Sequence, residues 1–149
     1  MNPSRILVAH DFSPHGDRAF ASGIALARRF GARLHVVHAY HLPVLVGMPD
    51  EIAIPPEFWV GVRDAATRRV EAAVASARAA GIAVEPHLVE GPPAEAIREV
   101  AEQTSADLIV IGTRGHTGLK HVLLGSVAER TLRHAPCAVL TVKDAVIGE

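Results

Sequence analysis

Hydrophobic and polar positions along the chain follow two alternating patterns. Short continuous apolar runs, typical of parallel strands buried on both faces, occupy residues 5–10, 34–39, 84–89, 107–111 and 137–142. Between them, apolar residues recur at helical spacing in four segments, which begin near Ser13, Trp59, Pro93 and Ser126. This alternation predicts a Rossmann-like α/β fold, a mostly parallel sheet with right-handed crossovers and helices on both faces.

Turn and capping residues mark the boundaries of these elements. Ser13 followed by Pro14 is typical of the start of a helix, and Gly31 is typical of its C-terminal end. Pro86 lies inside the third predicted strand, and because proline has no amide hydrogen to donate, this strand is expected at a sheet edge. Residues 40–58 contain four prolines and no clear periodicity, which predicts a long loop before the second helix.

Composition narrows the class of protein. A chain of 149 residues with 49% hydrophobic residues can bury one ordinary core, so we expect a single domain over residues 1–149. Charged residues make up 21% and the net charge is −1, which argues against a disordered chain and against a nucleic-acid-binding protein. The single cysteine, Cys137, excludes a disulfide framework within the chain. No apolar run is long enough for a membrane span or a signal peptide, so we expect a cytoplasmic protein.

The nine histidines are scattered along the sequence. A metal ion could be shared by His35 and His38, or by His38 and His41, only if both side chains of the pair projected from the same face of the strand. A strand sends residues i and i+3 to opposite faces, so this spacing argues against a histidine metal site.

The candidate chemistry gathers at the ends of two predicted strands. Ligands of open α/β sheets bind beyond the carboxyl ends of strands, where the strand order reverses. The first strand leads to Asp11 and the fourth to the glycine-rich residues 112–118. Glycines let backbone amides approach an anion, and a helix opening at Ser126 would add the positive end of its dipole. Positive or hydrogen-bonding groups nearby are Arg114, His116 and Lys120.

The same residues could also have purely structural roles instead of binding an anion. The G-x-G-x-x-G and P-loop motifs are absent, which argues against a conventional dehydrogenase or P-loop enzyme. Residues 126–129 also fit a capping box, with Ser126 as N-cap and Glu129 at N3. Asp11 could equally serve only as a turn residue that caps the first helix. Spacing alone leaves both phosphate binding and purely structural roles open.

The spacing Gly112-x2-Gly115-x9-Gly125-Ser126 resembles the nucleotide-binding signature of the universal stress protein family. Residues 6–13 and 91–97 and the whole segment 106–142 are also similar to that family, so the resemblance covers nearly all of the chain except the 40–58 loop. It implies a five-stranded parallel sheet of order 3-2-1-4-5, in agreement with the edge position expected for the strand of Pro86. It also implies ATP binding, because the family divides into ATP binders and members that bind no nucleotide, and the signature is intact here.

The resemblance further implies which residues hold the nucleotide. Asp11 would lie near the ribose and phosphates and act as a ligand of Mg²⁺. The adenine would be flanked by Ala9, Val37, His38 and Ala39. The ribose and phosphates would be held, largely through backbone amides, by Gly112, Gly115, Gly125, Ser126 and Val127. We infer phosphate contacts for Arg114 and His116 from their chemistry, since these positions differ in type among relatives.

Three functions compete for this chain. The first is an ATP-binding stress or signalling module that acts through partners. The second is a slow ATPase or phosphotransferase, for which Asp11, Arg114 and His116 could supply parts, although the glycine loop holds no second acidic residue. The third is a nucleotide-free dimeric structural protein that keeps the glycine loop as a vestige.

The last predicted strand, residues 137–142, also suggests a homodimer. In the order 3-2-1-4-5 it lies at a sheet edge, where it exposes unpaired amides and carbonyls. Antiparallel pairing with the same strand of a second copy would cover that edge, and relatives in the family commonly pair this way. The alternative is a monomer in which Lys143, Asp144 and the short tail protect the edge.

Overall fold

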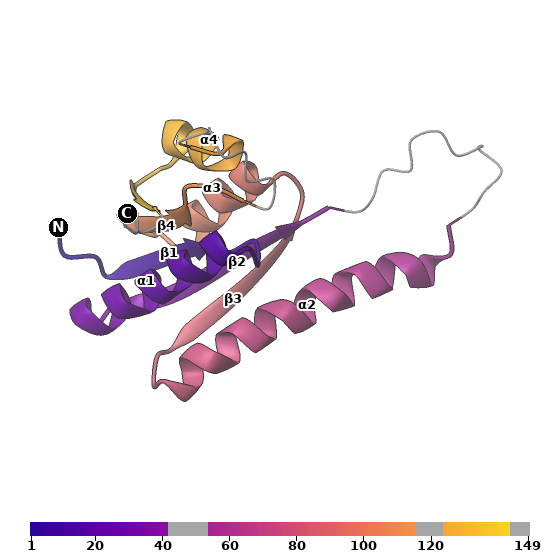
Figure 1. The fold of residues 1–149 in the computed structure, drawn as a ribbon, viewed down its shortest axis with the longest axis horizontal. Coiled ribbons are helices and arrows are strands. Elements are labelled where there is room, and N and C mark those ends of the chain that lie inside the picture. Colours follow the sequence, from indigo (N-terminus) through magenta and orange to yellow (C-terminus); the bar gives the residue numbers. More distant parts are fainter. Residues whose placement is uncertain (42–53, 116–123, 144–149) are drawn as a thin grey trace, which may run out of the picture.

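The computed structural model describes residues 1–41, 54–115 and 124–143. Strands and helices alternate along them (Figure 1). The strands are β1 (Arg5–Ala9), β2 (Arg33–Tyr40), β3 (Val84–Glu90), β4 (Leu108–Gly112) and β5 (Ala138–Val142). The helices are α1 (Pro14–Phe30), α2 (Pro56–Ala79), α3 (Pro93–Gln103) and α4 (Ser126–His134).

The strands form one sheet in the order β3-β2-β1-β4-β5, and every neighbouring pair is parallel. The central strand β1 sets the register, with Ile6 opposite Leu34 of β2 and Leu108 of β4. The predicted fold class and strand order are therefore confirmed. Pro86 lies in β3, an edge strand that pairs only with β2, where its missing amide hydrogen costs least.

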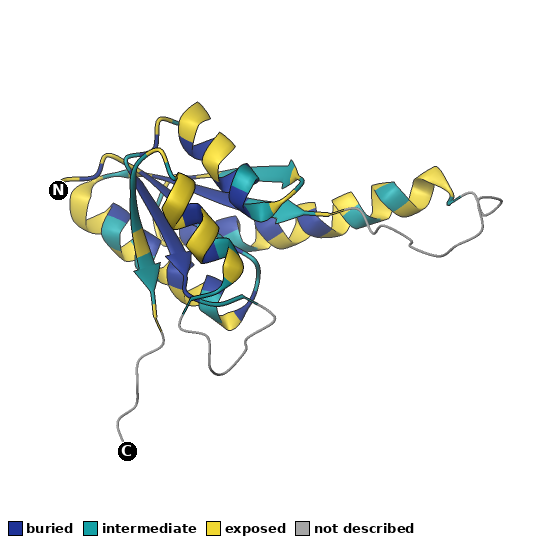
Figure 2. Cartoon of the chain, turned by 90° about the horizontal axis from the view of Figure 1, so that it is seen from above, coloured by how far each residue is buried: buried dark blue, intermediate teal, exposed yellow. Residues whose placement is uncertain are grey.

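Successive side chains of each strand enter opposite cores, as the pleat of a strand requires. Val8 and Val36 pack with α1 and α2 on one face, whereas Leu7 and Val37 pack with α3 and α4 on the other. Figure 2 shows buried residues concentrated in the sheet and on the helix sides that face it. The sheet is thus covered by helices on both faces.

The N-terminus of α1 is capped as predicted, but that of α4 is not. Ser13 Oγ accepts the Gly16 amide at 3.1 Å, and Gly31 ends α1 in the left-handed conformation with φ of 65°. For α4 the N-cap is Gly125, in extended conformation, which has no side chain to cap the helix. The capping box with Ser126 as N-cap is therefore wrong: Ser126 is already helical, and the Glu129 amide bonds the Gly125 carbonyl at 2.9 Å.

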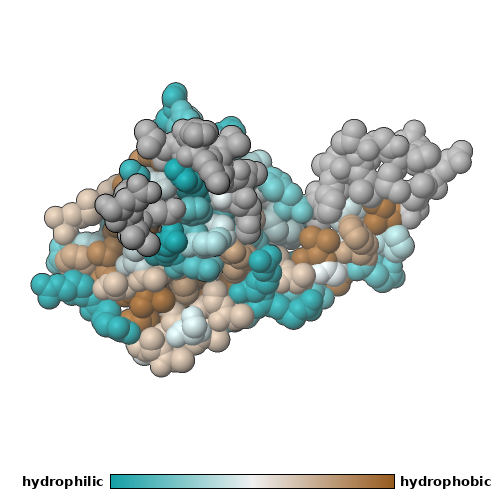
Figure 3. Space-filling view, viewed as in Figure 1, coloured by the Kyte–Doolittle hydropathy of each residue, from teal (hydrophilic) through white to brown (hydrophobic). Residues whose placement is uncertain are grey.

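The boundaries around α2 also differ from the predicted loop over residues 40–58. β2 continues to Tyr40 and α2 begins at Pro56, since proline suits the first helical turn. Residues 42–53 lie outside the described part of the chain. The C-terminal half of α2 packs on the sheet, while its first turns project beyond it and expose apolar surface (Figures 1 and 3). Among the described residues, no helix combines the length and apolar content needed to cross a membrane.

Candidate functional site

A cleft of about 470 Å³ opens at the carboxyl ends of β1, β2 and β4. This is the switch point at which the strand order reverses between β1 and β4. Eleven predicted site residues line it: Ala9, Asp11, Val37, His38, Ala39, Gly112, Arg114, Gly115, Gly125, Ser126 and Val127. The twelfth, His116, lies outside the described residues, as does Lys120. The structure brings the predicted residues together, and their contacts with a ligand remain predictions.

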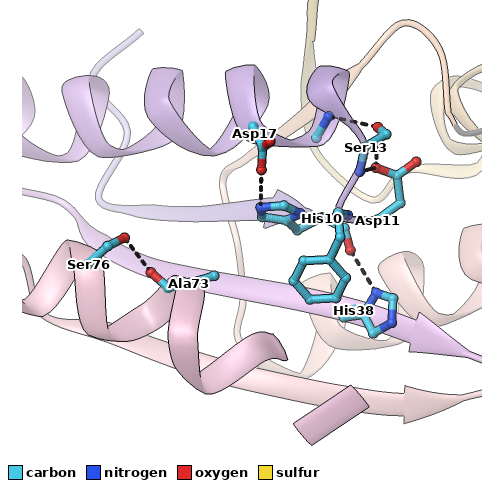
Figure 4. Close-up of polar contacts among 9 residues, drawn as sticks. His10, Asp11, Ser13, Asp17, His38, Ala73 and Ser76 are labelled. Carbon is cyan, nitrogen blue, oxygen red and sulfur yellow. Dashed lines mark hydrogen bonds and ion pairs between the residues drawn. The ribbon is translucent and has the colours of Figure 1, made fainter. Parts of the chain in front are cut away.

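Asp11 has one carboxylate oxygen in the turn that starts α1. Oδ1 accepts hydrogen bonds from the Ser13 amide at 3.0 Å and from Ser13 Oγ at 2.5 Å (Figure 4). The other oxygen, Oδ2, faces the glycine loop, because a Cβ at Gly115 would stand 3.0 Å from it. The turn role considered for Asp11 therefore exists, whereas the helix itself is capped by Ser13, and the turn holds the carboxylate in the lining of the cleft.

Next to Asp11, the ring of Phe12 contacts the rings of His10 and His38. The His10 carbonyl accepts a hydrogen bond from His38 Nδ1 at 2.9 Å, and His10 Nδ1 accepts the Phe12 amide at 2.9 Å. The remaining nitrogen of His10, Nε2, points to Asp17 of α1 at 3.4 Å (Figure 4). Phe12, held at φ of 61°, places its ring 4.5 Å from the His38 ring.

Two features determine the charge of this side of the cleft: the protonation state of His10 and the cationic side chain of Arg69. Burial lowers the pKa of His10, an effect that Asp17 and Asp11 oppose and that His38 and Arg69 reinforce. His10 is therefore neutral at pH 7, with its proton on Nε2 because Nδ1 already accepts a hydrogen bond. Arg69 of α2 lies over the Phe12 ring, 4.5 Å from its centre, and also lines the cleft. It is a cation that no local sequence pattern indicated.

Glycines allow the backbone to close around the cleft. At Gly112 a Cβ would stand 2.9 Å from the His15 carbonyl oxygen, and at Gly125 it would stand 3.3 Å from that of Thr113. The Gly125 amide donates to the same Thr113 carbonyl at 2.6 Å, which ties the end of the glycine loop to the end of β4. A side chain at Gly112 would collide with the backbone of His15, so this position needs glycine for close approach, and one at Gly115 would crowd the carboxylate of Asp11.

The first turn of α4 borders the cleft. Gly125, Ser126, Val127 and Ala128 line the cleft, and the N-cap residue Gly125 has no side chain with which to cap this helix. An uncapped helix N-terminus carries hydrogen-bond donors and a partial positive charge, which together suit an anion. Arg114 lines the cleft beside these amides and adds a cationic side chain.

Several lining residues were missed from the sequence: His10, Gly16, Arg69, Pro93, Ile97, Ile111, Thr113 and Ala128. His10, Ile111 and Thr113 adjoin predicted residues, so the ends of β1 and β4 could have indicated them. Pro93 and Ile97 come from α3 and give the cleft an apolar side. No sequence signal marked them, because their spacing is that of any helix packed on a sheet.

The fold and this cleft define a Rossmann-like α/β protein with a cleft at the switch point of a parallel sheet. Residues 3–143 match the universal stress protein family. The chain therefore belongs to the universal stress protein family.

The chain is similar to individual members of this family in sequence and in structure. A universal stress protein of Thermus aquaticus is 42% identical over 144 residues, which cover 93% of this chain and 97% of that protein. The universal stress protein of Archaeoglobus fulgidus, solved in complex with dAMP, is 27% identical with a TM-score of 0.66, covering 96% of this chain and 100% of that one. A universal stress protein solved in complex with cAMP is 25% identical with a TM-score of 0.71, covering 95% and 98%.

Proposed function

We propose that this protein binds ATP in the cleft and acts as a nucleotide-dependent stress or signalling module. The observation that carries the proposal is the N-terminus of α4, which borders the same cleft as Gly112, Gly115, Arg114 and Arg69 and whose N-cap, Gly125, has no side chain to cap the helix. Such a combination of backbone amides and guanidinium groups suits phosphates. Two structural relatives solved with dAMP and cAMP support an adenine nucleotide as the ligand.

The residues of the cleft fit both parts of a nucleotide. On the side of β2 and α3, Val37, Ala39, Pro93 and Ile97 form apolar walls that suit an adenine ring. On the opposite side, Gly115 leaves the space that a Cβ would fill beside Asp11. Asp11 is the carboxylate placed to hold Mg²⁺ together with phosphate oxygens and waters, the ligands that this ion prefers.

The glycine loop provides the test of nucleotide binding. Gly115→Val combined with Gly125→Val should weaken ATP binding at least about tenfold, roughly 1.4 kcal/mol, because a side chain at Gly115 meets Asp11 and one at Gly125 meets the backbone of Thr113 and Arg114, both at the cleft. Calorimetry measures the affinity, and circular dichroism verifies that the variant is folded. The matched control is Gly61→Val, since Gly61 lies in α2 with nothing within 4 Å of its Cβ position. Unchanged ATP affinity in a folded double variant would refute the proposal.

Binding with little turnover is the form of the proposal that we favour over a slow ATPase or phosphotransferase. In the part of the chain that the structure describes, Asp11 is the one carboxylate that lines the cleft. Phosphoryl transfer needs a positioned water or acceptor in addition to charge stabilisation. Phosphate release over many turnovers by the wild-type protein would contradict this form while leaving nucleotide binding intact.

We further propose a homodimer through β5, in a single-domain cytoplasmic protein. β5 is the edge strand next to β4, and Leu140 at its centre is 40% exposed. Beside it lies a shallow apolar hollow of about 270 Å³, lined by residues that include Pro3, Leu26, Phe30 and Val139. An apolar edge strand with apolar surface beside it suits antiparallel pairing with a second copy.

A further inference from the structure

Outside the nucleotide cleft, two histidines and a glutamate meet on the outer strands of the sheet. His35 of β2 lies opposite Glu85 of β3, and His87 follows Glu85 by two residues. Because side chains alternate along a strand, all three project from the same face, which is the face of Leu7 and Val37. None of the three lines the nucleotide cleft.

The ligand atoms of these residues are close together. His35 Nδ1 lies 3.1 Å from His87 Nε2 and 3.6 Å from Glu85 Oε2. One such atom from each residue lies within 4.8 Å of the others. Two atoms bound tetrahedrally to zinc at its usual bond lengths stand about 3.4 Å apart. The cluster therefore needs only a small inward movement of Glu85, whose side chain is exposed, to match a metal centre.

The geometry points to a divalent cation of the zinc class bound by His35, His87 and Glu85. Two imidazole nitrogens and one carboxylate oxygen form a ligand set that zinc accepts, with the fourth position left to water. Imidazole ligands favour zinc and its neighbours in the transition series over Mg²⁺, which selects oxygen. This site is separate from the proposed nucleotide site in its residues and in the metal that it selects.

Burial favours the neutral form of His35 and His87, which is the form that binds a metal ion. Burial lowers the pKa of His35, and the neighbouring His87 ring lowers it further, against the opposing effect of Glu85; Arg33 and Arg5 lower it as well. The pKa of His87 is also lowered by burial, again opposed by Glu85. Both rings are therefore neutral at pH 7, the form that binds metal, although the two guanidinium groups reduce the attraction for a cation. Glu85 supplies the compensating negative charge.

The competing explanation is a hydrogen bond between two neutral imidazoles that only fastens β3 to β2. Zinc titration of untagged, nucleotide-free protein by calorimetry separates the two. We expect saturable binding of one Zn²⁺ per chain, weakened at least about tenfold, roughly 1.4 kcal/mol, in His87→Gln and in Glu85→Gln. Both side chains are less buried than that of His35, so these variants should fold, and circular dichroism checks that they do.

Two control variants remove an imidazole elsewhere. His41→Gln and His134→Gln change exposed histidines outside the cluster and should leave zinc affinity within about twofold. Co²⁺ in place of Zn²⁺ gives a second readout, a visible absorption that His87→Gln should abolish. The proposal is overturned if wild-type protein shows no saturable zinc binding, or if folded His87→Gln binds zinc as tightly as wild type. It is equally overturned if the control variants lose as much affinity as His87→Gln.

Discussion

Replacing glycine by alanine should have opposite effects on the stability of the protein at Gly23 and at Gly61. Gly23 lies on the face of α1 that meets β1, and a Cβ there would stand 2.3 Å from Val8 Cγ2. Val8 is fully buried between Val36 of β2 and Val110 of β4, so it cannot move aside. α1 would have to shift outward. Gly61 is exposed in α2, with nothing within 4 Å of its Cβ position.

The magnitudes follow from two competing effects. Replacing glycine by alanine within a helix stabilises it by up to about 1 kcal/mol, while overfilling a packed core costs roughly 1–3 kcal/mol. At Gly61 only the first effect acts, so Gly61→Ala should raise the free energy of unfolding by about 0.5–1 kcal/mol. At Gly23 the collision is with a fully buried side chain, so Gly23→Ala should lower the free energy of unfolding by about 1–2 kcal/mol.

Urea unfolding followed by circular dichroism measures both variants against wild type. The midpoints should move in opposite directions at unchanged m-value, which would locate the effect in native stability. A Gly23→Ala variant as stable as Gly61→Ala would refute the close packing of α1 on β1.

Three further changes test other parts of the molecule. Burial alone would raise the pKa of Asp107, but hydrogen bonds from Ser4 and the Arg5 amide outweigh it and lower the pKa. Asp107→Asn should therefore lower the free energy of unfolding by about 1 kcal/mol at pH 7. That difference should shrink as the pH falls below about 4, because protonation of Asp107 removes the same stabilisation, and a pH-independent difference in urea unfolding would refute the reasoning. Asp11→Asn should weaken ATP binding more with Mg²⁺ than without it, and equal losses in calorimetry would restrict Asp11 to its turn. Leu140→Lys places a charge on the exposed edge strand and should convert a homodimer to monomer in light scattering, whereas a monomeric wild-type protein at micromolar concentration would exclude the dimer.

The sequence predicted those features of the fold that local chemistry determines. The β1–Asp11–Ser13–Pro14 segment was recognisable because strand end, cap and first helical turn each have their own residue preferences. Pro86 could be assigned to an edge because its missing amide hydrogen excludes it from a central ladder. The helix start at Ser126 was predicted, but its cap was not. Serine is a good N-cap in general, whereas here the bond from the Gly125 amide to the Thr113 carbonyl fixes Gly125 in the extended conformation of the cap.

Features created by pairing distant segments could not be predicted. Arg69 reaches the cleft because α2 crosses beside β2 and β3, and its place in the helix carries no local signal. The histidine spacing within β2 argued correctly that His35 and His38 do not share a face. It could not show that the register of β3 brings His87 and Glu85 to His35, because that depends on which residues of two strands lie opposite each other.

Nuclear magnetic resonance of ¹⁵N-labelled protein titrated with Mg-ATP tests the proposed site most directly, because each amide reports its own surroundings. We predict saturable changes at Ala9, Gly115, Gly125 and Val127, which line the cleft, and little change at His87 of β3 or at Gly61 of α2. Absence of saturable changes, or changes confined to residues away from the carboxyl ends of β1, β2 and β4, would contradict the proposal that this cleft binds ATP.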